Sequence, residues 1–183
     1  MDDRFEGTSV FDIPPLPDDV DHVREGFRIG AVIGSSGSGK TSLGREHFNI
    51  YDVLWNNENS CSAYDNMINA CKNKELPQNM TPDELAKELF GAVKLKKKVY
   101  DRPFDTFSSG EQHRAEIARV LLQAIIISGK AGMDQKKAVA FEEFTSLLDR
   151  PTAKAIALGV QGLSVKYKLK IVILSCHDDF IGE

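Results

Sequence analysis

The chain has 183 residues, of which 42% are hydrophobic and 27% are charged, and its formal net charge is −4. This length suffices for one globular domain with its own core, and the negative balance gives no support to a protein that coats nucleic acid. The longest apolar run, Val120 to Ile127, is too short to cross a membrane, and the acidic N-terminus does not resemble a secretory signal. Three cysteines without metal-site spacing indicate reduced thiols and a cytoplasmic protein.

The apolar segment from Phe27 to Ile33 predicts a parallel strand covered on both faces. Phe11 to Ile13 is a candidate short strand, and the prolines after it limit this piece to a sheet edge or a loop. An amphipathic helix is expected from Thr41 to Phe48. In the segment from Asn49 to Cys61 that follows, an asparagine-rich patch (Asn56, Asn57 and Asn59) predicts irregular backbone.

A glycine-rich turn joins the first strand to this helix. Its residues match the G-x-x-x-x-G-K-[ST] spacing of a phosphate-binding (Walker A) loop, and they are Gly34, Ser35, Ser36, Gly37, Ser38, Gly39, Lys40, Thr41 and Ser42. Glycines let successive N–H groups face an anion at a helix N-terminus. Lys40 then contacts the β- and γ-phosphates, and the Thr41 hydroxyl ligates Mg²⁺. A plain Gly/Ser-rich surface turn is the alternative, but the flanking strand and helix favour binding of a nucleoside triphosphate.

Residues 62–106 predict a small, mainly helical insertion. Thr81 is expected to cap a helix whose first residue is Pro82, with an apolar stripe formed by Leu85, Leu89 and Phe90. A basic cluster follows, consisting of Lys94, Lys96, Lys97, Lys98 and Arg102. We interpret it as a solvated face in preference to a nucleic-acid contact.

Helices and strands alternate in the rest of the chain. We expect a helix from Ser109 to Ile127, a polar loop from Gly129 to Lys137, a strand from Ala138 to Phe141, a helix from Asp149 to about Lys166, and a buried strand from Lys170 to Ser175. Gly159 and Gly162 weaken the prediction for the second half of the last helix. The alternation predicts an α/β fold with a largely parallel sheet, in one domain over residues 1–183. Ligands of such sheets bind beyond the carboxyl ends of the strands.

Three further motifs, taken with the glycine-rich loop, resemble those of ATP-binding-cassette (ABC) ATPases. Residues 107–119 are similar to the L-S-G-G-Q signature and the helix that follows it, and they include Ser108, Ser109, Gly110 and Glu111. Residues 138–149 are similar to the Walker B motif and the D-loop, with Glu142, Glu143 and Asp149. Residues 175–178 resemble the switch-histidine motif, with His177. The resemblance covers most of the chain from residue 27, and it is greatest to non-transporter ABC ATPases, stand-alone or fused to acetyltransferase-like domains, of phages and mobile elements.

This resemblance implies a P-loop NTPase fold, with an ABC-type nucleotide-binding domain and a reduced helical subdomain. ATP and Mg²⁺ would lie between two head-to-tail copies, in a homodimer that forms on ATP binding. Lys40, Glu143 and His177 would be catalytic, and Thr41 and Glu142 would ligate the metal. The segment from Ser108 to Glu111 would clamp the partner copy's nucleotide, and Asp149 would face the dimer interface.

The chain departs from the family pattern at several positions. Glu142 stands where the family has an aspartate, and Ser109 stands where it has a glycine. Gln78 is the candidate for the family's Q-loop glutamine, and the alternative is that Gln78 is an ordinary surface loop residue. The aromatic side chain that stacks on adenine would be Phe5 or Phe11. The chain ends just past His177, where relatives continue, and the sequence leaves open whether a terminal segment is missing.

Two functions follow from the resemblance. The first is an ATP hydrolase whose dimer drives a mechanical or regulatory step, and not obviously transport. The second is a nucleotide-gated interaction module with little hydrolysis, accessory to DNA modification or defence. A small-molecule kinase shares the glycine-rich loop, but the signature-like run and the paired acids argue against it. The sequence leaves open whether an unidentified protein partner takes part.

Overall fold

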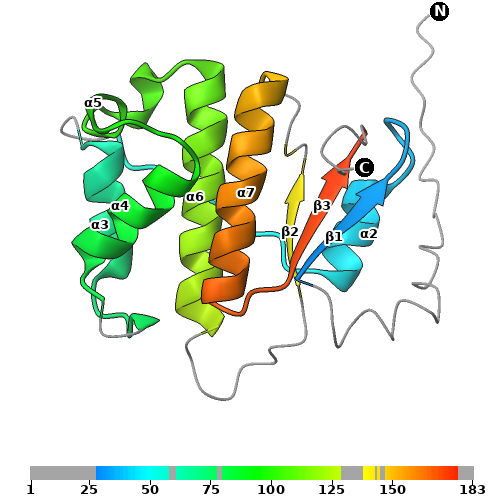
Figure 1. The fold of residues 1–183 in the computed structure, drawn as a ribbon, viewed down its shortest axis with the longest axis horizontal. Coiled ribbons are helices and arrows are strands. Elements are labelled where there is room, and N and C mark those ends of the chain that lie inside the picture. The colour runs from blue at the N-terminus through cyan, green and yellow to red at the C-terminus, as the bar shows by residue number, and fades with distance from the viewer. Residues whose placement is uncertain are drawn as a thin grey trace, which may run out of the picture.

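The computed structural model describes residues 28–57, 61–77, 80–128, 138–142, 144 and 147–176, and it contains a parallel sheet and a set of helices (Figure 1). Within these residues the strands are β1 (Ile29–Ile33), β2 (Val139–Glu142) and β3 (Ile171–Ser175), in the order β1-β3-β2. The helices are α2 (Lys40–His47), α3 (Ala63–Cys71), α4 (Pro82–Ala92), α5 (Lys97–Tyr100), α6 (Ser109–Ser128) and α7 (Arg150–Lys166), with a 3-10 turn at Phe104–Thr106. The predicted α/β class with a parallel sheet is confirmed.

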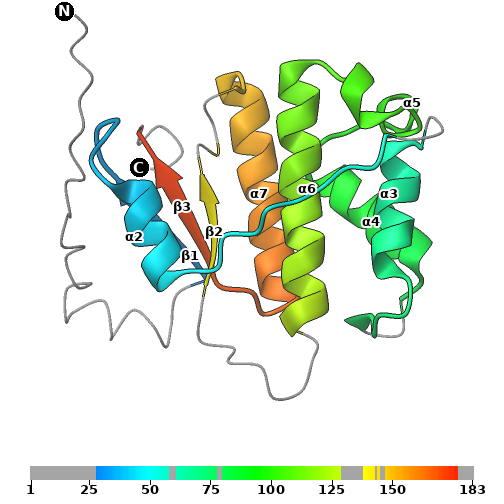
Figure 2. The same cartoon turned by 180° about the vertical axis from the view of Figure 1, so that it is seen from behind.

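Helices cover both faces of the sheet (Figures 1 and 2). Because successive side chains of a strand point to opposite faces, β2 and β3 each contribute to two separate cores. The smaller core lies under α2 and is formed by Ala138, Ala140, Val172 and Leu174, with Val32, Phe48 and Ile50 packed against it. On the opposite face Val139, Phe141, Ile171 and Ile173 join the main core together with α6 and α7. Burial on both faces explains why these strands are apolar throughout.

The helices between residues 62 and 106 pack on α6 and α7, on the side away from the sheet (Figure 1). The predicted start of α4 is confirmed, because Thr81 Oγ1 accepts from the Glu84 N–H at 3.2 Å and the Glu84 carboxylate accepts from the Thr81 N–H at 2.8 Å. This reciprocal pair satisfies two donors that a helix start leaves without partners. The predicted apolar stripe of α4 is fully buried.

One prediction about the sheet is wrong. β1 is not covered on both faces, since Ala31 is exposed and Ile33 keeps 44% of its surface accessible. The reason is the place of β3, which inserts between β1 and β2 and leaves β1 at the edge of the described sheet. The expected strand at Phe11–Ile13 and the expected loop at Gly129–Lys137 lie outside the described residues. No helix of the described part is long and apolar enough to cross a membrane.

α7 continues without a break through both of its glycines. A Cβ atom on Gly159 would lie 2.3 Å from the carbonyl oxygen of Ala92, the last residue of α4. A Cβ atom on Gly162 would meet nothing within 4 Å. Gly159 is therefore required by the close approach of two helices, and it does not mark a helix end.

We expect Gly159→Ala to destabilise the protein by about 1–3 kcal/mol, because the backbone of Ala92 must move to admit the methyl group. Gly162→Ala, in the same helix, is the matched control, and it should be neutral or stabilise by up to about 1 kcal/mol. Urea unfolding of both variants measures the difference. Equal free energies of unfolding for the two variants would contradict this account of the α4–α7 contact.

Candidate functional site

The glycine-rich loop between β1 and α2 forms an open cradle. Gly37 and Gly39 have φ values of +77° and +85°, a left-handed conformation that glycine adopts at little cost. A Cβ atom at either position would meet nothing within 4 Å, so the space beside this backbone is open. α2 begins at Lys40 with Gly39 as its N-cap, and glycine has no side chain that could accept from the first-turn N–H groups. These donors are left for an anion at the helix N-terminus.

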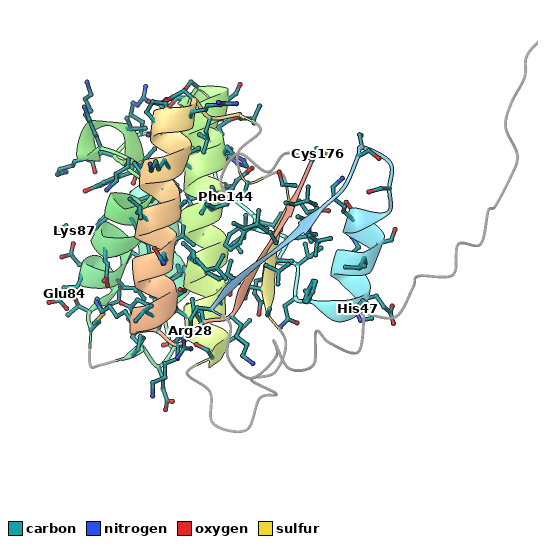
Figure 3. All side chains as sticks on the ribbon, turned by 45° about the vertical axis from the view of Figure 1, so that its right-hand side comes forward. Arg28, His47, Glu84, Lys87, Phe144 and Cys176 are labelled. Carbon is teal, nitrogen blue, oxygen red and sulfur yellow. The ribbon has the colours of Figure 1, made fainter. Side chains whose placement is uncertain are left out.

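The Lys40 ammonium lies over its own loop. Its Nζ donates to the carbonyl oxygens of Gly34 and Ser35, both at 2.8 Å, and it lies 3.3 Å from the Sγ of Cys176. Cys176 directly follows β3, so the carboxyl end of β3 is beside the loop, as Figure 3 shows. The Gly34 N–H also donates to the Ser175 carbonyl at 3.2 Å. The loop is therefore anchored to β3, while the Lys40 ammonium stays at the surface of the cradle.

Glu142 ends β2 at the same edge of the sheet. It is half-buried and pairs in register with Leu174 of β3. It follows Ala140 by two residues, which places it on the face of the sheet that α2 covers. Since β3 separates β1 from β2, the loop and Glu142 are two strand spacings apart, about 10 Å.

These residues fit ATP and Mg²⁺. The cradle offers N–H donors and an ammonium for phosphate, and the exposed Thr41 hydroxyl and the Glu142 carboxylate are the hard oxygen ligands that Mg²⁺ takes. Mg²⁺ is usually held by one or two such groups together with substrate phosphates. Of the other predicted residues, Glu143 and His177 lie outside the described residues, as do Gln78, Phe5 and Phe11.

The turn that begins α6 holds the second predicted phosphate contact, and Ser108 is exposed there. The Glu111 carboxylate accepts from the Ser108 N–H at 2.9 Å and from its hydroxyl at 3.0 Å, and Arg102 Nη2 lies 3.4 Å from the same carboxylate. The Ser108 N–H is the main reason that the pKa of Glu111 is lowered. The donors expected to meet a phosphate are thus engaged by a carboxylate of their own chain.

The N-termini of α2 and α6 lie at the same end of the molecule but apart from each other, with β2, β3 and α7 between them (Figures 1 and 2). Asp149, the predicted D-loop acid, is exposed at this end, where its Oδ1 accepts from the Thr152 N–H at 2.9 Å and caps α7. This backbone donor lowers the pKa of Asp149. The geometry therefore places the N-termini of α2 and α6 at one end of the molecule but too far apart to serve one ligand.

Two contacts at the site come from residues that the sequence argument did not single out. Cys176 touches Lys40, as described above, and His113 Nε2 lies 3.0 Å from the carbonyl oxygen of Phe144. The sequence carried a weak signal for His113, which falls inside the signature-like run. Its partner is a backbone carbonyl far along the chain, and sequence patterns do not reveal such a contact.

No protein-family model matches this sequence, and no curated protein matches it significantly. Among solved structures, the chain is similar to a metal-chelate type ABC transporter in an inward-facing conformation, with a TM-score of 0.54 and 16% identity over 81% of this chain and 63% of that chain. It is also similar to CbiO1 from Clostridium perfringens, part of the ABC transporter complex CbiONQ, with a TM-score of 0.53 and 21% identity over 82% of this chain and 67% of that chain. The chain thus spans less than two thirds of the first of these structures. It has the fold of ABC nucleotide-binding domains.

The capping carboxylate at the start of α6 predicts a pH effect. Because the folded-state pKa of Glu111 lies below its ordinary value of 4.5, its ionised form stabilises the protein at neutral pH, and this contribution is lost as the pH falls through the folded-state pKa. Glu111→Gln should therefore lower the free energy of unfolding at pH 7 by about 0.5–1 kcal/mol, the usual value of a charge at a helix N-terminus. At pH 3 the difference from the wild type should shrink.

Urea unfolding at both pH values measures this difference. Glu116→Gln is the control, because Glu116 is exposed on the same helix beyond its first turn. A difference between the wild type and Glu111→Gln that is unchanged at pH 3 would rule out the ionised carboxylate as its source.

Proposed function

We propose that this chain is a cytoplasmic, Mg²⁺-dependent ATPase of ABC type that hydrolyses ATP as a head-to-tail homodimer. The observation that supports the proposal is that two separate helix N-termini, the glycine-rich cradle at Lys40 and the Ser108 turn, lie at one end of the molecule. Each is half of a phosphate site. Two copies related by a twofold axis would complete two whole sites.

Hydrolysis would use residues from both copies. Lys40 would leave the Gly34 and Ser35 carbonyls for the β- and γ-phosphates, while Glu143 accepts a proton from the water that attacks the γ-phosphorus. The bond between the γ-phosphorus and the β–γ bridging oxygen breaks, and ADP and phosphate leave. His177 would contact the γ-phosphate. When bound, Mg²⁺ at Thr41 and Glu142 would neutralise phosphate charge.

The work done by the dimer is proposed to be mechanical or regulatory and not transport. The helical insertion between residues 62 and 106 is small, and it leaves little surface for the coupling helix of a membrane partner. Although the similar structures named above belong to transporters, the sequence runs around Asp149 and Ser175 resemble the non-transporter group of phages and mobile elements. This resemblance supports a role outside transport.

Lys40→Ala should raise the Kd for ATP by at least about 100-fold, because the cradle loses the only charge it offers to the β- and γ-phosphates in the described loop. Arg45→Ala, in the same helix but in its last turn, is the control and should bind ATP as the wild type does. Equilibrium binding of a fluorescent ATP analogue measures both. Unchanged affinity in Lys40→Ala would mean that the loop does not hold the phosphates.

Glu143→Gln should convert the protein into a stable dimer at saturating ATP and Mg²⁺, because binding is kept while the proton acceptor for hydrolysis is removed. Light scattering should give twice the monomer mass, and steady-state phosphate release should fall by at least about 100-fold. The control is the same variant with ADP, which should remain monomeric. A monomer at saturating ATP would exclude the two-copy arrangement.

A second candidate is a nucleotide-gated interaction module with little hydrolysis, in a system of DNA modification or defence. It is favoured by the Glu111 carboxylate, which takes both donors of Ser108 and repels a phosphate brought by a second copy. Glu142, which stands where the family has an aspartate, also favours this second candidate. In this case ATP would still dimerise the protein, but the wild type would release no phosphate at any protein concentration.

A further inference from the structure

His113 ties the first turns of α6 to the chain that follows β2. Its Nε2 lies 3.0 Å from the Phe144 carbonyl oxygen, and since a carbonyl only accepts, Nε2 carries the proton and donates it. Phe144 is fully buried, and its ring packs against that of Phe141 in β2 with 6.0 Å between centroids. Figure 3 shows Phe144 beside α6. The accepting carbonyl is therefore held by the main core.

A second contact joins the same two segments. A Cβ atom on Gly110 would lie 3.4 Å from the Leu147 carbonyl oxygen, so the first turn of α6 packs closely on the backbone after Phe144. On its other side α6 is held by Arg114, which donates to the Gly110 carbonyl at 3.0 Å and to the Lys94 carbonyl at 2.9 Å. The Ser108 turn is therefore linked both to the chain that follows α4 and to the chain that follows β2.

We propose that His113 is a positioning residue that couples the Ser108 turn to the acids Glu142 and Glu143 of its own chain. Phe144 lies two residues after Glu142, the last residue of β2, so a hydrogen bond to its carbonyl restrains the chain directly after this strand. This inference rests on the proposed function, in which Ser108 serves one nucleotide of the dimer and the acids serve the other. His113 then lies on the physical path between the two sites.

The coupling has a defined energetic consequence. When a phosphate engages Ser108, any movement of the α6 N-terminus passes through His113 and the Gly110–Leu147 contact to the acids. Positive cooperativity between the two ATP sites is the measurable result. Small errors in the position of a catalytic group reduce kcat strongly while leaving ground-state binding in place.

The test compares three substitutions of His113 by the ATP dependence of phosphate release. His113→Gln keeps an N–H donor at the reach of Nε2, and it should retain kcat within about threefold of the wild type and its Hill coefficient. His113→Leu removes the donor. His113→Asn keeps an N–H donor, but its side chain is too short to reach the Phe144 carbonyl oxygen. Both should lower kcat by about tenfold or more, keep KM within about twofold, and lower the Hill coefficient below that of the wild type. Glu116→Gln, exposed on the same helix, is the control and should match the wild type.

A purely structural role makes a different prediction. It would lower thermal stability in all three variants and would leave the kcat of the folded fraction unchanged. That result, or equal losses of kcat in His113→Gln and His113→Asn, would overturn the coupling while the ATPase proposal stands. If His113→Leu does not fold, the kcat values of His113→Gln and His113→Asn decide whether His113 couples the two sites. A wild type that binds no ATP would overturn both proposals together.

Discussion

The parallel pairing of β3 with both β1 and β2 is the constraint on which the rest of the structure depends. Ile29 to Ile33 align with Ile171 to Ser175 on one side of β3, and Val139 to Glu142 align with Ile171 to Leu174 on the other. With all three strands in one direction, the glycine-rich loop, Cys176 and Glu142 come to the same edge. The hydrogen bond from Gly34 to Ser175 continues this pairing into the loop. An antiparallel β3 would keep the core apolar but would take Cys176 away from Lys40.

α6 provides the second framework of the molecule. It is buried along most of its length, between the sheet and the helices α3 and α4, so its first turn cannot move without disturbing contacts on both sides. Because this turn directly follows Ser108, packing within the chain sets the position of the second proposed phosphate contact. His113 and Arg114 fix the turn to opposite neighbours. A surface serine thereby gains a defined position relative to Glu142 at the end of β2.

Both candidate phosphate contacts are engaged by groups of the same chain. Two neutral carbonyls hold the Lys40 ammonium, while an ionised carboxylate holds the donors of Ser108. A triphosphate displaces the carbonyls readily, because its charge attracts the ammonium far more strongly than their dipoles do. At Ser108 the triphosphate must instead displace the Glu111 carboxylate, which repels it because both groups are negatively charged. The two halves of the proposed site therefore differ in how easily ATP would engage them.

The sequence by itself determined the α/β class, most element boundaries, the helix start at Thr81 and the identity of the glycine-rich loop, because apolar periodicity, capping residues and turn glycines act over a few neighbouring positions. It did not determine the edge position of β1, the close approach at Gly159, or the contacts Lys40–Cys176 and His113–Phe144. Each of these joins segments far apart in the chain. Only the tertiary structure decides such contacts, since they depend on which strand inserts between which others and on how closely helices pack.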